Sequence, residues 1–581
     1  MSFCGLFFVR NRRALQGLSD APYHIMGRHA LCARGVRADG GAMACAFGHL
    51  RNAAALRNQL TQAGMLAPDA QSDPSALTLA AYRMWGESYP AHLEGPVSTV
   101  LIDQDAQRLV LSRDRMGEKI LFYAVRGCSV AFADHPAPLL DSGVATRAVN
   151  REGWCEVFAL GPARTPGRTP LRDVMSLQPG CALVADAYGH AIHRYFELSA
   201  HPHEHDEATT VRTVRELIEQ AVDDIMPLEP ACMLSGGLDS TVLAALMSKR
   251  MGRPLSTWSV DYTDSARFFT GNNFQIERDA PYIEQANALF GADAHMVTLT
   301  SDQLCDGLDK AMELRGFPGM GDIDSSLMLF THAIADERRF VVSGECSDEV
   351  FGGYPWFNRE ELITAEGFPW SGSMQLRESV LRASVREKLG LSRYACMRYH
   401  ESACSLPRLS SDGAREALLR QLHGLCFEWF MPNLQERAVC MCADTDLGVL
   451  TPFADERLAQ YVYNVPWSMK RMGGVEKGLL RAAAADLLPE QLLMRKKSPY
   501  PKTHHPRYAQ LMRERMRRIL SDKASPILDL IDAQAVTALV ESPLDAAATP
   551  WFGQLMSGPQ LLAYLVQVNQ WMLRYRIDID L

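Results

Sequence analysis

A short segment rich in serine and glycine has the residue types that bind phosphate groups. It reads Ser-Gly-Gly-Leu-Asp-Ser, follows an apolar stretch and precedes a helical pattern. Glycines let the backbone turn tightly and approach an anion, and N–H groups at the start of a helix point toward it. A carboxylate there could hold Mg2+ against phosphate oxygens. The segment therefore predicts a phosphate-binding loop, and the alternative is a turn whose aspartate only caps the helix. The predicted loop residues are Ser235, Gly236, Gly237, Leu238, Asp239 and Ser240.

A second polar motif follows another apolar stretch and is rich in acidic residues. Ser343–Glu349 reads Ser-Gly-Glu-Cys-Ser-Asp-Glu, and Phe-Gly-Gly-Tyr follows at Phe351–Tyr354. Asp348 could complete a Mg2+ site with Asp239, and Glu345 could orient a substrate or transfer a proton. An acidic surface loop is the alternative, but the presence of the first motif favours a functional site.

The elements around these motifs predict how the motifs meet. From about residue 210 strands and helices alternate, which is typical of a parallel sheet covered by helices on both faces. Ligands of such sheets bind at the carboxyl ends of the strands, so we expect the two motifs to lie together. The chain beyond about residue 375 is mainly helical. Strands are expected at Ala231–Leu234, Leu255–Tyr262, His295–Thr300 and Phe340–Ser343, and helices at Thr210–Ile225 and Thr241–Arg250.

The chain up to about residue 195 has a different pattern. Short strands bounded by turn residues are interrupted by two helical patterns, which indicates a β-rich α+β domain. The polar segment His201–Thr210 has no periodicity and is expected to be a linker. Its three histidines could bind a metal, but a flexible segment does not preorganise ligands. Strands are expected at Val97–Ile102, Leu109–Ser112, Ile120–Ala124 and Ser129–Ala133, and helices at Ala53–Ala63 and Ser75–Trp85.

Composition narrows the class of protein. Of the 581 residues, 47% are hydrophobic and 22% are charged, with a formal net charge of -9. An acidic chain argues against nucleic-acid binding, which usually needs a basic face. The 14 cysteines form no CxxC pair and are typical of reduced thiols in a cytoplasmic protein. No stretch approaches the roughly 20 apolar residues of a membrane span.

Together the two motifs resemble the synthetase domain of asparagine synthetases, and the likeness extends from about residue 210 to 510. The phosphate loop is similar to that of enzymes that split ATP into AMP and pyrophosphate, and it lacks the lysine of the GxxxxGK[ST] loop. Further stretches that agree with one bacterial branch of the family are Trp258–Tyr262, Asp322–Leu327, Tyr463–Trp467 and Arg495–Thr503.

The resemblance implies a fold and a reaction for residues 210–581. The fold would be adenine-nucleotide α-hydrolase-like, of the PP-loop ATP pyrophosphatase type, with ATP and Mg2+ as cofactors. The enzyme would activate a carboxylate as an acyl-adenylate and pass the acyl group to ammonia or an amine. Val260 would lie near the adenine, with Ser343 and Gly344 near the AMP. Lys497 stands at the family's essential lysine, where its charge suits pyrophosphate and the acyl-adenylate.

Residues 1–200 resemble the family's glutamine amidotransferase type 2 domain, an N-terminal-nucleophile (Ntn) fold. Active members begin Met-Cys-Gly, whereas Cys4 is terminal here only if residues 1–3 are removed. The family's Asn-Gly-Glu-Ile-Tyr-Asn segment reads Phe-Gly-His-Leu-Arg-Asn at Phe47–Asn52. That change removes an oxyanion-stabilising asparagine and an amine-binding glutamate. Ser72 and Asp73 are retained from the glutamine-binding segment. We therefore expect a degenerate glutaminase site, Cys4 as a buried thiol, and a domain that serves as scaffold or interface.

A second departure concerns the expected substrate pocket. Four positions that are charged in the family are here uncharged, and their loss would change the charge complementarity of the pocket. This favours a changed acyl substrate or nucleophile over ordinary asparagine synthesis. The four residues are Val439, Cys440, Gly448 and Leu450.

Several functions stay open at this point. The expected partners are a small-molecule or peptide carboxylate and ammonia or an amine, without nucleic acid or membrane, and a homodimer is possible. One alternative is a glutamine-dependent asparagine synthetase whose amino terminus is processed. Others are a lasso-peptide cyclase, which forms a macrolactam, or a β-lactam synthetase, whose glutaminase domains have lost the nucleophile. A non-catalytic regulatory homologue and a tRNA-modifying enzyme with a similar loop complete the set.

Overall fold

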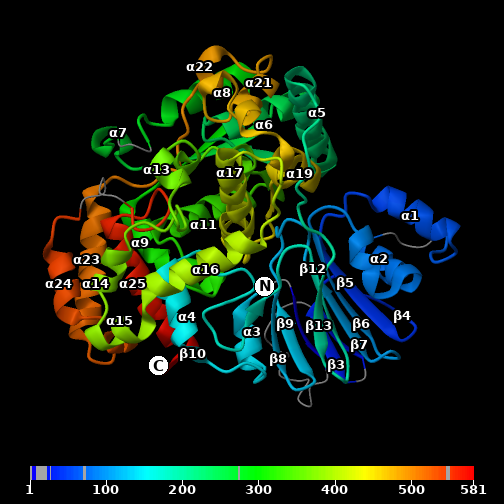
Figure 1. Ribbon diagram of the computed structural model, residues 1–581, viewed down its shortest axis with the longest axis horizontal. Helices are drawn as coiled ribbons and strands as arrows, with labels where there is room; N and C mark the ends of the chain where they lie inside the picture. Colours follow the sequence, from blue (N-terminus) through cyan, green and yellow to red (C-terminus); the bar gives the residue numbers. More distant parts are fainter. Residues whose placement is uncertain (1–2, 8–21, 27, 70–72, 272–274, 545–549) are drawn as a thin grey trace. The chain divides into compact units, whose positions relative to one another are not determined.

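A computed structural model describes the chain as two compact units (Figure 1). The described residues are 1–581 without 1–2, 8–21, 27, 70–72, 272–274 and 545–549. The first unit contains Met1–Gly153, Thr165–Glu197 and Asp578–Asp580, and the second contains Trp154–Arg164 and Leu198–Ile577 with Leu581. Of residues 1–3, whose removal would make Cys4 terminal, only Phe3 is described, and Ser72 lies outside the described residues.

The first unit is an α+β sandwich. Among its described residues are two six-stranded sheets, in the orders β11-β8-β9-β1-β3-β2 and β13-β12-β7-β6-β5-β4. Alternate residues of a strand point to opposite faces, and β5 uses this: Met43 and Cys45 enter the core between the sheets, whereas Ala44 packs on the side of the helices. The elements are β1 (Phe3–Phe7), β2 (Tyr23–Met26), β3 (His29–Ala33), β4 (Arg37–Asp39), β5 (Ala42–Gly48), β6 (Val97–Asp103), β7 (Arg108–Ser112), β8 (Phe122–Arg126), β9 (Ser129–Ala133), β11 (Met175–Ser176), β12 (Cys181–Ala185), β13 (His190–Arg194), α1 (Ala53–Gln62) and α2 (Pro74–Trp85).

The second unit is built on a parallel sheet. Its order is β16-β15-β14-β17-β18, and every adjacent pair is parallel. The expected parallel sheet is thereby confirmed, with one strand more than the sequence indicated. The strands are β14 (Ala231–Met233), β15 (Ser256–Tyr262), β16 (Asp293–Leu299), β17 (Phe340–Val342) and the unpredicted β18 (Gly448–Leu450).

Helices surround this sheet and make up most of the chain after residue 375. Near the sheet, α6 packs on β14, α8 on β15 and α11 on β16. The long last helix is almost entirely buried and closes the unit. The helices used below are α5 (Glu207–Ile225), α6 (Leu238–Arg250), α8 (Ala280–Phe290), α11 (Asp322–Ala335), α12 (Ser347–Phe351), α17 (Ala414–Leu425), α18 (Met431–Cys440), α20 (Trp467–Lys470), α21 (Gly478–Ala483) and α25 (Gly558–Tyr575).

Two stretches differ from the expected boundary near residue 200. Trp154–Arg164 belongs to the second unit, because its side chains pack among later helices: Trp154 meets Trp571 edge to face, and Tyr394 donates a hydrogen bond to Glu156. The expected flexible linker is also bound to the second unit. The backbone N–H of His201 donates to Asn464, and His205 bonds to Tyr461.

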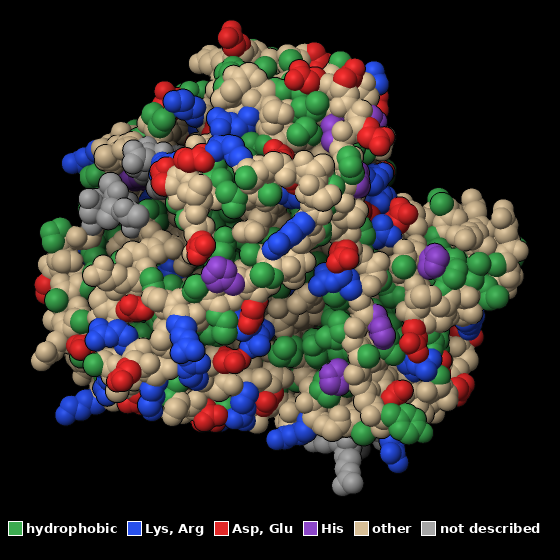
Figure 2. All heavy atoms as spheres, viewed as in Figure 1, with side chains coloured by type: hydrophobic (Ala, Val, Ile, Leu, Met, Phe, Trp, Pro, Cys, Tyr) green, Lys and Arg blue, Asp and Glu red, His purple; other side chains and the backbone are tan. Residues whose placement is uncertain are grey.

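The structure gives the state of the cysteines and the distribution of charge on one face. All fourteen cysteines are free thiols, as expected for reduced cysteines. On the face shown in Figure 2, basic and acidic side chains are interspersed. Within the described ranges, none of the helices has the length and apolar character needed to cross a membrane.

Candidate active site

The serine–glycine segment forms the turn between β14 and α6. Gly236 has a φ of 67°, and a Cβ there would lie 2.8 Å from the backbone nitrogen of Ile283, so only glycine fits. Gly237 is the N-cap of α6 and offers no side chain to accept from the first-turn N–H groups. This arrangement suits an anion.

The two serine hydroxyls hold the loop together. Ser235 Oγ lies 3.1 Å from Ser240 Oγ, and the backbone N–H of Ser235 donates to Ser240 Oγ at 3.2 Å. The loop is therefore preorganised by its own side chains.

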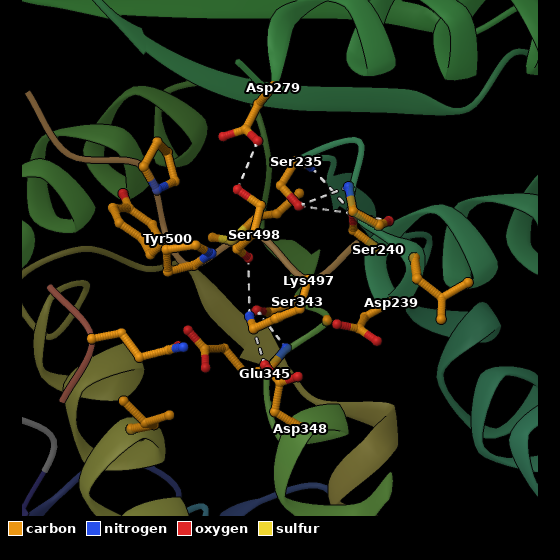
Figure 3. Close-up of a pocket in the computed structure, with 18 of the residues that line it drawn as sticks. Ser235, Asp239, Ser240, Asp279, Ser343, Glu345, Asp348, Lys497, Ser498 and Tyr500 are labelled. Carbon is orange, nitrogen blue, oxygen red and sulfur yellow. Dashed lines mark hydrogen bonds and ion pairs between the residues drawn. The ribbon is translucent and has the colours of Figure 1, made fainter. Parts of the chain in front are cut away.

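The acidic motif meets this loop because β17 lies beside β14 in the sheet. A Cβ on Gly344 would lie 3.0 Å from the backbone nitrogen of Ser240, so the two loops touch through a glycine. Ser347 Oγ donates to Asp239 Oδ1 at 2.7 Å. The expected meeting of the two motifs is confirmed, and Figure 3 shows their labelled side chains around one cavity.

Two lysines link the carboxylates of the two motifs. Lys477 Nζ lies 2.7 Å from Asp239 Oδ1 and 2.5 Å from Asp348 Oδ1. Lys497 Nζ lies 2.6 Å from Asp348 Oδ2. All four side chains line the cavity. Lys477 was not predicted from the sequence, where the only nearby signal is the glycine pair at residues 473–474.

These ion pairs shift the protonation of both partners toward the charged forms. Burial alone would raise the pKa of Asp348, but the charges of Lys477 and Lys497 outweigh it and lower that pKa. Burial alone would lower the pKa of Lys497, but Asp348 and Asp239 outweigh it and raise that pKa. An opposite charge close by favours the charged form of each group.

Glu345 faces the cavity and is held by an arginine that the sequence analysis missed. Arg437 Nη2 donates to Glu345 Oε1 at 2.7 Å. The arginine is buried, and its guanidinium lies 5.3 Å from the centre of the Tyr500 ring. Arg437 lies on α18 two residues before Val439, and residues at that spacing point to different faces of a helix, so no local signal marked it.

The residue that was expected near the adenine also lies along the cavity. Val260 lines it together with Trp258 and Ile283. Arg495 is ion-paired with Asp279 and donates to the backbone oxygen of Ser235. The segment that contains Arg495 and Lys497 therefore contacts the phosphate loop.

The structure gives the positions of the four uncharged substitutions relative to the cavity. The residues of α18 that line the cavity are Leu434 and Arg437, and none of the four is in the lining. Gly448 is in β18, where a Cβ would lie 2.7 Å from the Phe340 ring. Leu450, also in β18, accepts the backbone N–H of Ser343. Gly448 and Leu450 thus contact residues of β17 and the segment that follows it, and the effect of the four substitutions on substrate choice stays a prediction.

In the first unit, the surroundings of Cys4 are those of a core residue. Cys4 is fully buried, as expected, on β1 between Cys32 of β3 and Ala133 of β9. Burial, followed by the neighbouring Cys32, raises the pKa of the Cys4 thiol. Phe47, at the position of the family's asparagine, stacks on Phe3 with ring centroids 4.0 Å apart.

Asp73 has a structural role in this fold. Its carboxylate caps α2 by accepting the backbone N–H groups of Ser75 and Ala76. It also pairs with Arg37 at 2.8 Å. Neither contact tests the glutamine-binding role of Asp73, which stays a prediction.

Comparisons with known proteins identify the family. A family model described as asparagine synthase matches residues 213–573, and one described as a glutamine amidotransferase domain matches residues 32–196. Fold and matches define the class: this is a carbon–nitrogen ligase that carries a glutamine amidotransferase domain. The chain is 38% identical to "Asparagine synthetase [glutamine-hydrolyzing] 3" of Bacillus subtilis, over 92% of this chain and 87% of that protein. The protein belongs to the asparagine synthetase family.

More distant relatives are similar over shorter parts. "Asparagine synthetase [glutamine-hydrolyzing] 1" of Bacillus subtilis is 23% identical over 78% of this chain and 74% of its own length. "Amidase chyE" of Penicillium rubens is 28% identical over 52% of this chain and 46% of its own length.

Proposed function

We propose that the protein is an AMP- and pyrophosphate-forming amide ligase that activates a carboxylate as an acyl-adenylate. The observation that carries this proposal is the contact between the two motifs at Gly344 and Ser240. It combines an anion-binding loop, two carboxylates and two lysines in one cavity.

In the first step, an oxygen of the substrate carboxylate attacks the α-phosphorus of ATP. The bond to the β-phosphate breaks, and pyrophosphate leaves. The loop Ser235–Ser240 would bind the pyrophosphate through backbone N–H groups. Lys477 and Lys497 would stabilise the charge that develops on the leaving group. Val260 would contact the adenine, and Ser343 and Gly344 would lie near the AMP.

In the second step, ammonia or an amine attacks the acyl carbon. The new C–N bond forms, the bond to the AMP oxygen breaks, and the nitrogen loses a proton. Glu345 is the candidate acceptor of that proton, because its carboxylate faces the cavity and is fixed by Arg437. A fixed carboxylate within reach of the nucleophile can act as a general base.

The donor set fits Mg2+. Asp239 and Asp348 both contact Lys477 Nζ, so their oxygens already surround one cationic position. In the part of the chain that the structure describes, no group of three or more acidic, histidine or cysteine side chains could enclose a metal. Two carboxylates suit Mg2+, which keeps water and phosphate ligands. When bound, the ion would neutralise charge on the pyrophosphate.

Glutamine-dependent asparagine synthesis is a second candidate. It is favoured by the identity of 38% with a Bacillus subtilis protein of that name, whereas the four uncharged substitutions favour a changed substrate. Burial of Cys4 at 0% exposure weighs against glutamine hydrolysis by the chain as it stands. The cavity adds no observation that favours a lasso-peptide cyclase or a β-lactam synthetase, and the paired aspartates and lysines argue against a non-catalytic homologue.

Substrate-dependent pyrophosphate release tests the proposal. Purified protein would receive ATP, Mg2+ and aspartate with glutamine, ammonium or neither. Aspartate labelled with 18O in its side-chain carboxylate should transfer one label to AMP if the acyl-adenylate forms. Label in phosphate with ADP as the product would overturn the mechanism. Asparagine formed from glutamine would support the second candidate, and turnover with ammonium alone would support an inactive glutaminase domain.

A further inference from the structure

Two buried polar side chains lie behind the acidic motif and take no part in the proposed chemistry. His423 on α17 is 0% exposed, and Lys470 at the end of α20 is 2% exposed. Burial of a polar group costs free energy unless the group is hydrogen-bonded. The partners of these two residues therefore indicate what they do.

His423 binds the carboxyl-terminal end of α12. Its Nε2 atom lies 2.7 Å from the backbone oxygen of Glu349 and 3.1 Å from that of Val350. The last carbonyls of a helix have no partner inside it. The preceding carbonyl, of Asp348, accepts the N–H of Gly353 at 2.9 Å. His423 thus supplies the donor that these two carbonyls lack.

Lys470 fixes which ring nitrogen of His423 carries the hydrogen. Lys470 Nζ lies 3.2 Å from His423 Nδ1, so Nδ1 accepts and Nε2 donates. Burial and the charge of Lys470 lower the pKa of His423 well below its ordinary value, so the ring is neutral and has one donor and one acceptor. Burial lowers the pKa of Lys470 to about 7, and the charged groups that act on it are Glu416, Arg420 and Asp412.

The position of α12 depends on such bonds from outside the helix. It has only five residues, and a helix this short is not stable alone. It carries Asp348, which meets Lys477 and Lys497. We propose that His423, oriented by Lys470, is a positioning residue that fixes α12 and thereby the Asp348 carboxylate. This inference rests on the proposed function, because it assigns Asp348 to the Mg2+ and pyrophosphate end of the ATP site.

Two substitutions of His423 separate this role from general stability. His423→Phe keeps a ring but removes the donor, whereas His423→Gln keeps an N–H group that can reach the carbonyls. The matched control is Tyr564→Phe, which removes a buried hydroxyl that donates to the backbone oxygen of Val157 at 2.7 Å. Lys470→Met tests the second link and leaves the carbonyl contacts in place. Thermal melts would confirm that each variant is folded.

The measurements are kcat for pyrophosphate release and the Mg2+ concentration that gives half the maximal rate. His423→Phe should lower kcat about tenfold and raise the Mg2+ requirement, since loss of a buried hydrogen-bond partner has an effect of that order. The KM for the acyl substrate should stay unchanged. His423→Gln should restore most of the rate, and Lys470→Met should fall between the two.

Wild-type kinetics in His423→Phe, or equal losses in His423→Phe, His423→Gln and Tyr564→Phe, would overturn the inference. Absence of pyrophosphate release from the wild type would instead contradict the proposed function. In that case Mg2+ binding, measured by calorimetry with pyrophosphate present, decides the inference. Weaker binding in His423→Phe with recovery in His423→Gln supports it, and equal binding in all variants overturns it.

Discussion

Lys477 Nζ lies 2.7 Å from both carboxylate oxygens of Asp239. The lysine side chain is 3% exposed, and its φ of 52° lies in the left-handed region. Such conformations cost free energy in a residue other than glycine and cluster at functional sites. Gly353 leaves the necessary room, because a Cβ there would lie 2.1 Å from Lys477 Cε. The pair therefore joins a strained backbone position to the phosphate loop.

Removal of the Lys477 charge should slow the first step. Lys477→Met is expected to lower pyrophosphate release by about 10²–10³-fold, the usual effect of losing one preorganised charge-stabilising donor. Lys310→Met is the control, because Lys310 pairs with Asp444 at 2.9 Å and is half exposed. A full rate in Lys477→Met would remove this lysine from the mechanism.

The other members of the ion-pair cluster should be equally necessary. Asp239→Asn, Asp348→Asn and Lys497→Ala are each expected to abolish pyrophosphate release, because each removes one charge from the cluster that would hold Mg2+ and the leaving pyrophosphate. Calorimetric titration with ATP would distinguish lost binding from lost chemistry. Wild-type activity in Asp239→Asn would refute the proposed mechanism.

Cys4 should not be needed for synthesis when the nitrogen is supplied directly. Cys4→Ala is expected to leave ammonia-dependent or amine-dependent product formation within about twofold of the wild type, since the nucleophile of a glutaminase serves only glutamine hydrolysis. The product would be measured by liquid chromatography. Mass spectrometry of the purified protein would show whether residues 1–3 are present. Complete loss of activity with ammonium would show that the first unit does more than scaffold the chain.

Close approach of the two loops can be tested with one added methyl group. Gly344→Ala would put a Cβ 3.0 Å from the backbone nitrogen of Ser240, a tight contact that is relieved when one loop moves by a few tenths of an ångström. Pyrophosphate release should fall at least tenfold, which corresponds to about 1.4 kcal/mol in the barrier. Gly252→Ala is the control, because a Cβ there has nothing within 4 Å. Equal activity of the two variants would contradict the observed contact.

His504 should make stability depend on pH. Burial, followed by the charge of Lys502, lowers the pKa of His504 to about 4. A folded-state pKa below the unfolded value of about 6.5 means that stability is full above that value and is lost as pH falls toward 4. Melting temperatures at pH 7 and pH 5 should therefore differ less in His504→Gln than in the wild type. His190→Gln, which replaces an exposed histidine, should behave like the wild type, and an unchanged difference in His504→Gln would contradict the prediction.

The parts of the fold that could be predicted are those marked by stretches of residues that are adjacent in the chain. Predicted stretches of four to eight residues gave four of the five strands in the parallel sheet. The fifth, Gly448–Leu450, was missed because that segment was interpreted as part of the substrate pocket. Trp154–Arg164 was assigned to the first unit by its place in the chain, whereas the packing of Trp154 on Trp571 places it in the second.

The sequence by itself determined the parts of the site whose residues are neighbours in the chain. Ser235–Ser240 and Ser343–Asp348 carry their glycines, hydroxyls and carboxylates at fixed spacing, and their place after two strands of a parallel sheet predicted that they would meet. Only the tertiary structure decided their partners. Lys477 is 238 residues from Asp239, and Arg437 is 92 residues from Glu345. Two charged side chains this far apart in the sequence pair only when folding brings their segments together. The geometry of an ion pair depends on side-chain positions that no local sequence pattern specifies.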